Sequence, residues 1–200
     1  IEGLSDKDQL EKFVAWGNKI ESYDFSKMTK LKSINLIGSP VKEIKGLSAA
    51  GSNLTTLDLG STQISSLDVT QNTELQKLNL SYVKGITTLD LSNNTRLTEL
   101  TTNNSGIREL KLGSKNGLKN INVSGSKLSS LDISEAGTIE NIAVGLQTDA
   151  TGTNQQIKVT MTQLQKDYFD SKGIIFTENI IANNSDKNRP NSNVKVIIKQ

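Results

Sequence analysis

Two aspartates in the middle of the chain are candidates for a calcium site. Asp68 and Asp90 end the similar stretches ISSLD and ITTLD, and Ca²⁺ prefers carboxylate and other oxygen ligands. The next equivalent residues are Lys111 and Asp132, so Lys111 would offset the repulsion between the acids. The neighbouring residues offer few further oxygens: Ser66, Thr70, Thr88 and Ser92. A solvated charge ladder is therefore the favoured interpretation, and no metal site is predicted.

The chain lacks the side chains on which much enzyme chemistry depends. Its 200 residues include no histidine and no cysteine, which removes the commonest general base and any thiolate nucleophile or ligand. Asp58 and Glu99 could form the carboxylate pair of a glycosidase, but nothing distinguishes them from surface residues. No phosphate-binding loop, HExxH or GxSxG motif is present. The sequence predicts a protein that is not an enzyme and that needs no cofactor.

Composition narrows the partner classes. The net charge is +2, with charges of both signs interspersed, which does not favour nucleic-acid binding. No apolar run approaches the roughly 20 residues of a membrane span. Because the chain begins at Ile1 rather than at methionine, we expect that a leader, such as a secretory signal, has been removed.

A short apolar motif repeats along most of the chain. Copies of L-x-x-L-x-L, with Ile or Val allowed, recur every 10 or 11 residues from Leu54 to Ile139, so two copies form a unit of 21 or 22 residues. Earlier copies begin at Leu31 and, in degenerate form, at Val41. The fourth and sixth positions alternate as in a β-strand and point inward. One coil cannot bury its apolar side alone, so the coils must stack as a parallel solenoid.

These copies, for example LTTLDLGSTQI at 54–64 and ITTLDLSNNTRL at 86–97, resemble the leucine-rich repeat family over about 31–145. They are most similar to the short repeats of bacterial secreted and cell-surface proteins. The resemblance implies an α/β fold: a right-handed solenoid with a parallel β-sheet, in which Asn72 and Asn94 form an inward amide ladder. Hydroxyl groups occupy the corresponding place in the alternate copies, with Val83 as an exception: Ser39, Thr62, Ser105 and Ser126.

Caps are expected at both ends of an open solenoid. We predict three regions: a helical N-terminal cap at 1–30, repeats at 31–145 and an α/β C-terminal cap at 146–200. Ser5 and Asp8 have capping-box spacing before the expected first helix. Trp16 is assigned to this cap as a covering residue, with a ligand-stacking platform as the alternative. In the C-terminal cap, Thr162 would begin a helix and Gly173 would end it, between two strands.

The favoured binding face is formed by the set of copies that begins at Leu31, Leu54, Leu75, Leu97, Leu118 and Ile139. Their outward residues are mostly small and polar, and Lys77 and Glu99 should pair across neighbouring coils. The candidate binding residues are Asn35, Asp58, Lys77, Asn79, Tyr82, Glu99, Thr101, Asn120 and Asn122.

The function predicted from the repeats is a non-catalytic binding scaffold, secreted or on the cell surface, that mediates protein–protein interaction or adhesion. Its expected partner is another protein or a host surface molecule. Two alternatives stay open: a structural spacer or assembly module of a larger surface protein, and, less favoured, a carbohydrate-binding protein. The sequence leaves the oligomeric state undetermined.

Overall fold

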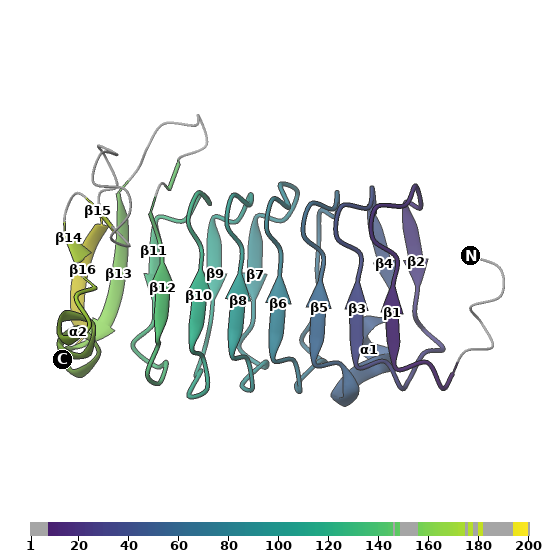
Figure 1. The fold of residues 1–200 in the computed structure, drawn as a ribbon, viewed down its shortest axis with the longest axis horizontal. Coiled ribbons are helices and arrows are strands. Elements are labelled where there is room, and N and C mark those ends of the chain that lie inside the picture. The colour runs from purple at the N-terminus through teal and green to yellow at the C-terminus, as the bar shows by residue number, and fades with distance from the viewer. Residues whose placement is uncertain are drawn as a thin grey trace.

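The chain winds into a parallel β-solenoid in which each coil contributes short strands to one or both of its long sides (Figure 1). The computed structural model describes residues 8–145, 147–148, 156–174, 176–177, 180–181 and 194–199. Successive coils are in register at steps of 21 to 23 residues, as the pairs Lys12↔Ser33, Ser33↔Thr56 and Thr56↔Lys77 show. This is the architecture that the resemblance to leucine-rich repeats implies.

One side of the solenoid is a continuous parallel sheet of seven three-residue strands. Each strand buries its central residue and points its first and third residues outward; the buried column includes Ile34, Leu57, Leu78, Leu100 and Ile121. This sheet contains the strand set that the sequence favoured. In spatial order the strands are β1 (Lys12–Val14), β3 (Ser33–Asn35), β5 (Thr56–Asp58), β6 (Lys77–Asn79), β8 (Glu99–Thr101), β10 (Asn120–Asn122) and β12 (Asn141–Ala143).

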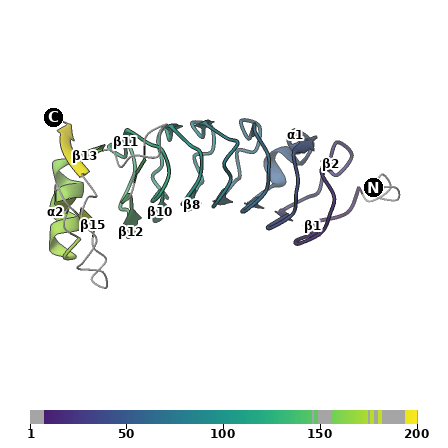
Figure 2. The ribbon, with the colours of Figure 1, turned by 90° about the horizontal axis from the view of Figure 1, so that it is seen from above.

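The opposite side is a discontinuous row of strands. It consists of the pairs β2 (Ser22–Asp24)–β4 (Glu43–Lys45) and β7 (Thr88–Asp90)–β9 (Glu109–Lys111), and of the sheet β11 (Ser130–Asp132)–β13 (Ile157–Thr162)–β16 (Val194–Lys199). The helical turns α1 (Leu47–Ala50) and η1 (Gly51–Asn53) are inserted after β4, on this side of the solenoid (Figure 2). Residues 66–68, in the following coil, form no strand.

The expected N-terminal helix is wrong within the described residues: β1 and β2 occupy that part of the chain, and residues 8–30 form a first coil. Ser5 lies outside the described residues. Aromatic side chains replace the leucines of later coils, so that Phe13, Tyr23 and Phe25 pack with ring centroids 5.2 to 5.8 Å apart. The cap is therefore a coil with an aromatic core, whose strand β1 pairs directly with β3.

The predicted amide ladder is present and continues beyond the asparagines. Asn94 Nδ2 donates to the carbonyl oxygens of Val69 (2.9 Å) and Asn72 (2.8 Å), and is fully buried. In the next coil the position is held by Lys115, also fully buried, whose Nζ donates to the carbonyls of Leu91 (2.8 Å) and Leu112 (2.5 Å). Turn carbonyls that no strand satisfies are thus bonded by side chains.

The described residues after the last coil include a strand, β13, followed by a helix, α2, at the place where the sequence predicts a helix. Helix α2 (Gln163–Ser171) begins with a capping box between Thr162 and Gln165 and is followed by Gly173, whose φ is +68°. Gln165 Nε2 also donates to the carbonyls of Ile133 (2.8 Å) and Ala136 (2.7 Å), so the helix supplies the amide for the last coil of the ladder. Two short strands, β14 (Phe176–Thr177) and β15 (Ile180–Ile181), form a separate antiparallel pair.

Candidate functional site

The candidate binding residues all belong to the side of the solenoid that carries the seven-stranded sheet. Eight are outward residues of β3, β5, β6, β8 and β10, and Tyr82 lies three residues after β6: Asn35, Asp58, Lys77, Asn79, Glu99, Thr101, Asn120, Asn122 and Tyr82. The register aligns them in columns, with Asp58 beside Asn79 and Asn79 beside Thr101. The structure brings them together as a surface; whether they bind a partner stays a prediction.

Several of these side chains are already engaged in turns of the scaffold. Asp58 Oδ1 accepts hydrogen bonds from the Gly60 backbone N–H (3.1 Å) and from Asn79 Nδ2 (2.9 Å). Asn79 Oδ1 in turn accepts from the N–H of Ser81 (2.9 Å). Such turns let a short side chain replace a backbone acceptor. The aspartate and asparagine oxygens of this column therefore hold the end of each strand, which reduces what they can offer a partner.

The expected ion pair on the face is confirmed. Lys77 Nζ lies 2.7 Å from Glu99 Oε1, and the two side chains are 53% and 42% exposed. At that exposure the pair contributes little to stability. Similar pairs link neighbouring coils elsewhere, including Lys32–Glu11 at 2.8 Å. Together they set a fixed pattern of charge on the surface.

Sequence reasoning included Tyr82 but missed the apolar side chains that the first coil adds to this face. Val14 and Trp16, on and just after β1, are 46% and 68% exposed, and Ile37, the equivalent of Trp16 in the next coil, is 39% exposed. Tyr82 is 54% exposed further along the same edge. The interpretation of Trp16 as a covering residue is therefore wrong. The signal was the stretch Leu10-Glu-Lys-Phe13-Val-Ala, which fits L-x-x-L-x-L if phenylalanine and alanine are allowed.

The aspartates of the opposite row also serve the scaffold. Asp68 Oδ1 accepts from the Thr70 backbone N–H at 2.9 Å, and Asp90 Oδ1 accepts from the Ser92 N–H at 2.8 Å. Hydrogen bonds from the hydroxyl and N–H of Ser92, and then from Lys111, lower the pKa of Asp90 to about 2. The Thr70 N–H, followed by its hydroxyl, likewise lowers the pKa of Asp68.

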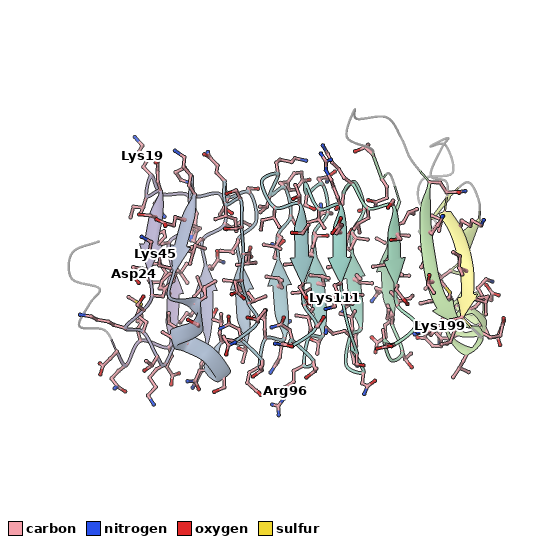
Figure 3. All side chains as sticks on the ribbon, turned by 180° about the vertical axis from the view of Figure 1, so that it is seen from behind. Lys19, Asp24, Lys45, Arg96, Lys111 and Lys199 are labelled. Carbon is pink, nitrogen blue, oxygen red and sulfur yellow. The ribbon has the colours of Figure 1, made fainter. Side chains whose placement is uncertain are left out.

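Lys111 balances this row as expected, with its Nζ 3.1 Å from Asp90 Oδ2. Figure 3 shows Asp24, Lys45 and Lys111 along this side of the solenoid. In the described part of the chain, no group of three or more acidic side chains is placed to hold a metal ion. Asp68 and Asp90 are thus bonded to turn donors, and Asp90 also to Lys111.

The possible glycosidase pair is not assembled. Strand β6 lies between the strands of Asp58 and Glu99, so their backbones are about 10 Å apart at the usual strand spacing. Glu99 is paired with Lys77, and Asp58 is held in its turn.

A hollow of about 370 Å³ lies between the last coils and helix α2. Ala136, Ile139, Tyr168 and Phe169 contribute to its lining, and the described residues that line it include no carboxylate and no lysine. These described residues supply neither an acid–base pair nor a charged anchor for a substrate.

Within the described residues, none of the helices has the length and apolar character required to cross a bilayer.

The comparisons with known proteins find solved structures alone. No protein-family model and no curated protein matches the chain. The functional domain of InlJ from Listeria monocytogenes, described as including a cysteine ladder, is 16% identical over 80% of this chain and 46% of that chain, with a TM-score of 0.45. The internalin InlF from Listeria monocytogenes strain 4b F2365 is 21% identical over 78% of this chain and 57% of that chain, with a TM-score of 0.46.

The chain thus spans about half the length of these two structures.

Proposed function

We propose that this protein is a non-catalytic binding scaffold whose seven-stranded sheet face receives a protein partner. The observation that carries the proposal is where the exposed large apolar side chains of the coils lie. Val14, Trp16, Ile37 and Tyr82 all lie on this face or at its edge. Exposed aromatic and aliphatic groups on a soluble domain mark interaction surfaces when they gather in one place.

The opposite row has a different surface. Its strands β2, β4, β7, β9 and β11 present serine, threonine and charged side chains outward, such as Ser22, Asp24, Glu43 and Lys45. The exposed aliphatic side chains of this row, Ile197 and Ile198, lie on β16, beyond these coils. A charged, polar surface of this kind favours solvation over stable burial. The difference between the two sides therefore supports one binding face.

The coils behind the face hold its strands in place before any partner arrives. The ladder side chains Asn72 and Asn94 bond the turns of neighbouring coils, and Ser126 Oγ donates to the Thr102 carbonyl at 2.7 Å. A preorganised surface loses little conformational entropy on binding. The regular scaffold thus supports recognition by an extended, rigid face.

The proposal places the protein outside the cell, secreted or on the cell surface, with a protein or host surface molecule as partner. Support for this part is the resemblance of the repeats to those of bacterial secreted proteins. Sequencing the full precursor tests it, since a signal peptide or lipid-anchor motif would support export. A precursor with neither would contradict it.

The absence of cysteine from the chain allows a clean test of which side binds. Single cysteines replace Ser33 and Thr101 on the proposed face, and Ser22 and Thr88 at outward strand positions on the opposite side. Each variant is coupled to polyethylene glycol maleimide and tested against peptides selected on the unmodified protein from a random displayed library. A label at 33 or 101 should block binding, while labels at 22 and 88 should not. The reverse pattern would overturn the proposal.

A structural spacer is the second candidate, because much of the face is small and polar and its turn oxygens are already bonded. It predicts that no selected peptide binds the sheet face, and that the isolated protein stays monomeric by light scattering. The spacer function would be contradicted by specific peptide binding that is blocked by a label at position 33 or 101.

A further inference from the structure

We propose that the first coils form a docking site for an acidic polypeptide segment that carries a large apolar side chain. This inference rests on the proposed function and assigns its centre to Val14, Trp16 and Ile37, called the apolar patch below. Trp16 and Ile37 occupy equivalent places on neighbouring coils, since the N–H of Gly17 donates to the carbonyl of Ile37 at 3.1 Å. Their side chains therefore project about one strand spacing apart.

The apolar patch is exposed by position and not by poor packing. Strand β1 buries Phe13 in the aromatic core, and its alternation turns Val14 outward. Trp16 follows in the same outward sense and stays 68% exposed. An exposed tryptophan next to two aliphatic side chains is the composition of a binding hot spot, which is enriched in tryptophan.

The charged side chains beside the apolar patch indicate which kind of partner it would bind. Lys12 shares the outward side of β1 with Val14, and Lys19 follows Trp16 in the next turn and projects from the edge of the first coil (Figure 3). Among the described residues neither ammonium group has an ion-pair partner. The glutamates of this coil are occupied: Glu11 by Lys32 at 2.8 Å and Glu21 by Lys42 at 2.9 Å. Two free cations beside an apolar surface favour a segment with carboxylates.

The polar groups beside the patch favour a polypeptide over a sugar. A sugar stacked on Trp16 would need several free hydrogen-bond acceptors around its ring. Asn35 Oδ1 already accepts from the Ile37 N–H at 3.1 Å, and Asp58 Oδ1 accepts from Gly60 and Asn79. The groups that remain for a partner to contact are the apolar side chains and the positive charges. An acidic, apolar peptide is complementary to both.

The test uses the full chain and a random peptide library displayed on phage. Selected peptides should combine aspartate or glutamate with tryptophan, phenylalanine or leucine. Their affinity should fall about thirtyfold or more in Trp16→Ala, the loss typical of a hot-spot truncation. Leu164→Ala, which removes an 80% exposed apolar side chain from α2, is the matched control and should leave affinity unchanged. Ile37→Ser is a second patch variant, and a thermal melt of each checks that it folds.

A charge reversal separates the electrostatic part of the proposal. Lys12→Glu with Lys19→Glu should weaken the same peptides by about tenfold or more, less so at high salt. Lys27→Glu with Lys30→Glu changes the net charge equally, in a neighbouring turn of the same coil, and should have little effect. Equal loss in both double variants would overturn the role of Lys12 and Lys19.

The outcomes distinguish this inference from the proposed function. Peptides that bind Trp16→Ala normally, but are blocked by a label at residue 33 or 101, would overturn the docking site and leave the binding face standing. Peptides insensitive to every change on the sheet face would overturn both. Failure to enrich any acidic, apolar peptide, or Trp16-dependent binding on a glycan array, would overturn the assignment of partner chemistry.

Discussion

The Lys115 ammonium nitrogen lies 2.8 Å from the Leu91 carbonyl oxygen of the preceding coil, in the fully buried interior of the solenoid. Lys115 follows Leu112 by the same three residues that separate Asn94 from Leu91. Lys115 therefore takes the place of an asparagine in this ladder and donates to a carbonyl of the preceding coil. Gln147 shows that a neutral amide suffices, since its Nε2 donates to the carbonyls of Val123 (2.7 Å) and Val144 (3.0 Å) with the same sequence offsets.

Lys115 should make stability rise with alkaline pH. Burial lowers its pKa to about 8 from the ordinary 10.5, partly opposed by Asp90. The folded state therefore favours the neutral amine, and the cost of burying the charge, present in full below pH 8, is relieved as pH rises toward 10.5. We expect the free energy of unfolding to gain about 1–3 kcal/mol over that range from this residue.

Lys115→Gln keeps the ladder donors without the charge. Denaturant unfolding between pH 7 and 10.5 should show a flatter profile for this variant than for the parent protein. Other groups that titrate in this range are common to both proteins, so the difference isolates Lys115. Parallel profiles would contradict the account.

Removing the side chains of two adjacent asparagines, Asn93 and Asn94, should lower the stability of the fold by different amounts. Asn94→Ala removes the donor to two buried carbonyls, of Val69 and Asn72, and should cost about 2–4 kcal/mol. Asn93→Ala removes one exposed hydrogen bond of 3.2 Å, to Thr70, and should cost less than about 1 kcal/mol. Urea unfolding of both variants checks the ranking, and equal losses would contradict the ladder.

Two glycines at the same place in the repeat, Gly106 and Gly117, should also differ in how much stability their substitution by alanine costs. A Cβ on Gly106 would lie 2.1 Å from the Lys84 carbonyl oxygen, whereas at Gly117 the nearest heavy atom is 3.9 Å away. We expect Gly106→Ala to lose about 2 kcal/mol or more, because backbone must move. Gly117→Ala should change stability by about 0.5 kcal/mol at most or raise it slightly. The melting temperatures of the two variants test this, and a Gly106→Ala protein as stable as the parent would show that the coils are not packed this closely.

Asp90 should respond to acid and not to calcium. Its lowered pKa means that its stabilising contribution is present above the unfolded pKa near 4 and is lost as pH falls through about 2. Asp90→Asn keeps an oxygen acceptor for Ser92 and should cost under about 1 kcal/mol at neutral pH, since the site is exposed. The melting temperature should not change with calcium or chelator. A calcium-dependent rise that Asp90→Asn abolishes would establish a metal site instead.

The repeats were predictable because each coil obeys the same rule. Leucines such as Leu57 and Leu78 must point inward at every turn, so the spacing of the motif fixes the register of strands. The first coil was misassigned for a physical reason: Leu10, Phe13 and Val14 also have the spacing of a helix face. Residues 12–14 instead form strand β1, because they pair with β3, and this pairing turns Val14 and Trp16 outward.

The rest of the ladder depends on contacts that motif spacing does not reveal. Gln165 reaches the carbonyl of Ile133 from a helix some thirty residues later, and a lysine at position 115 reads as a surface residue until its coil is stacked. The favoured strands do form one continuous outward surface, but the large apolar residue that is most exposed on it, Trp16, was missed because it lay in the misassigned cap.

Hydroxyl-radical footprinting of the full chain with a bound, library-selected peptide tests the binding face most directly. Trp16 and Tyr82 report on the sheet side, and Leu164 on helix α2 reports on exposed surface elsewhere. The account predicts protection of Trp16, extending to Ile37, with Leu164 unchanged. Protection of Leu164 with Trp16 and Tyr82 still fully reactive would contradict it.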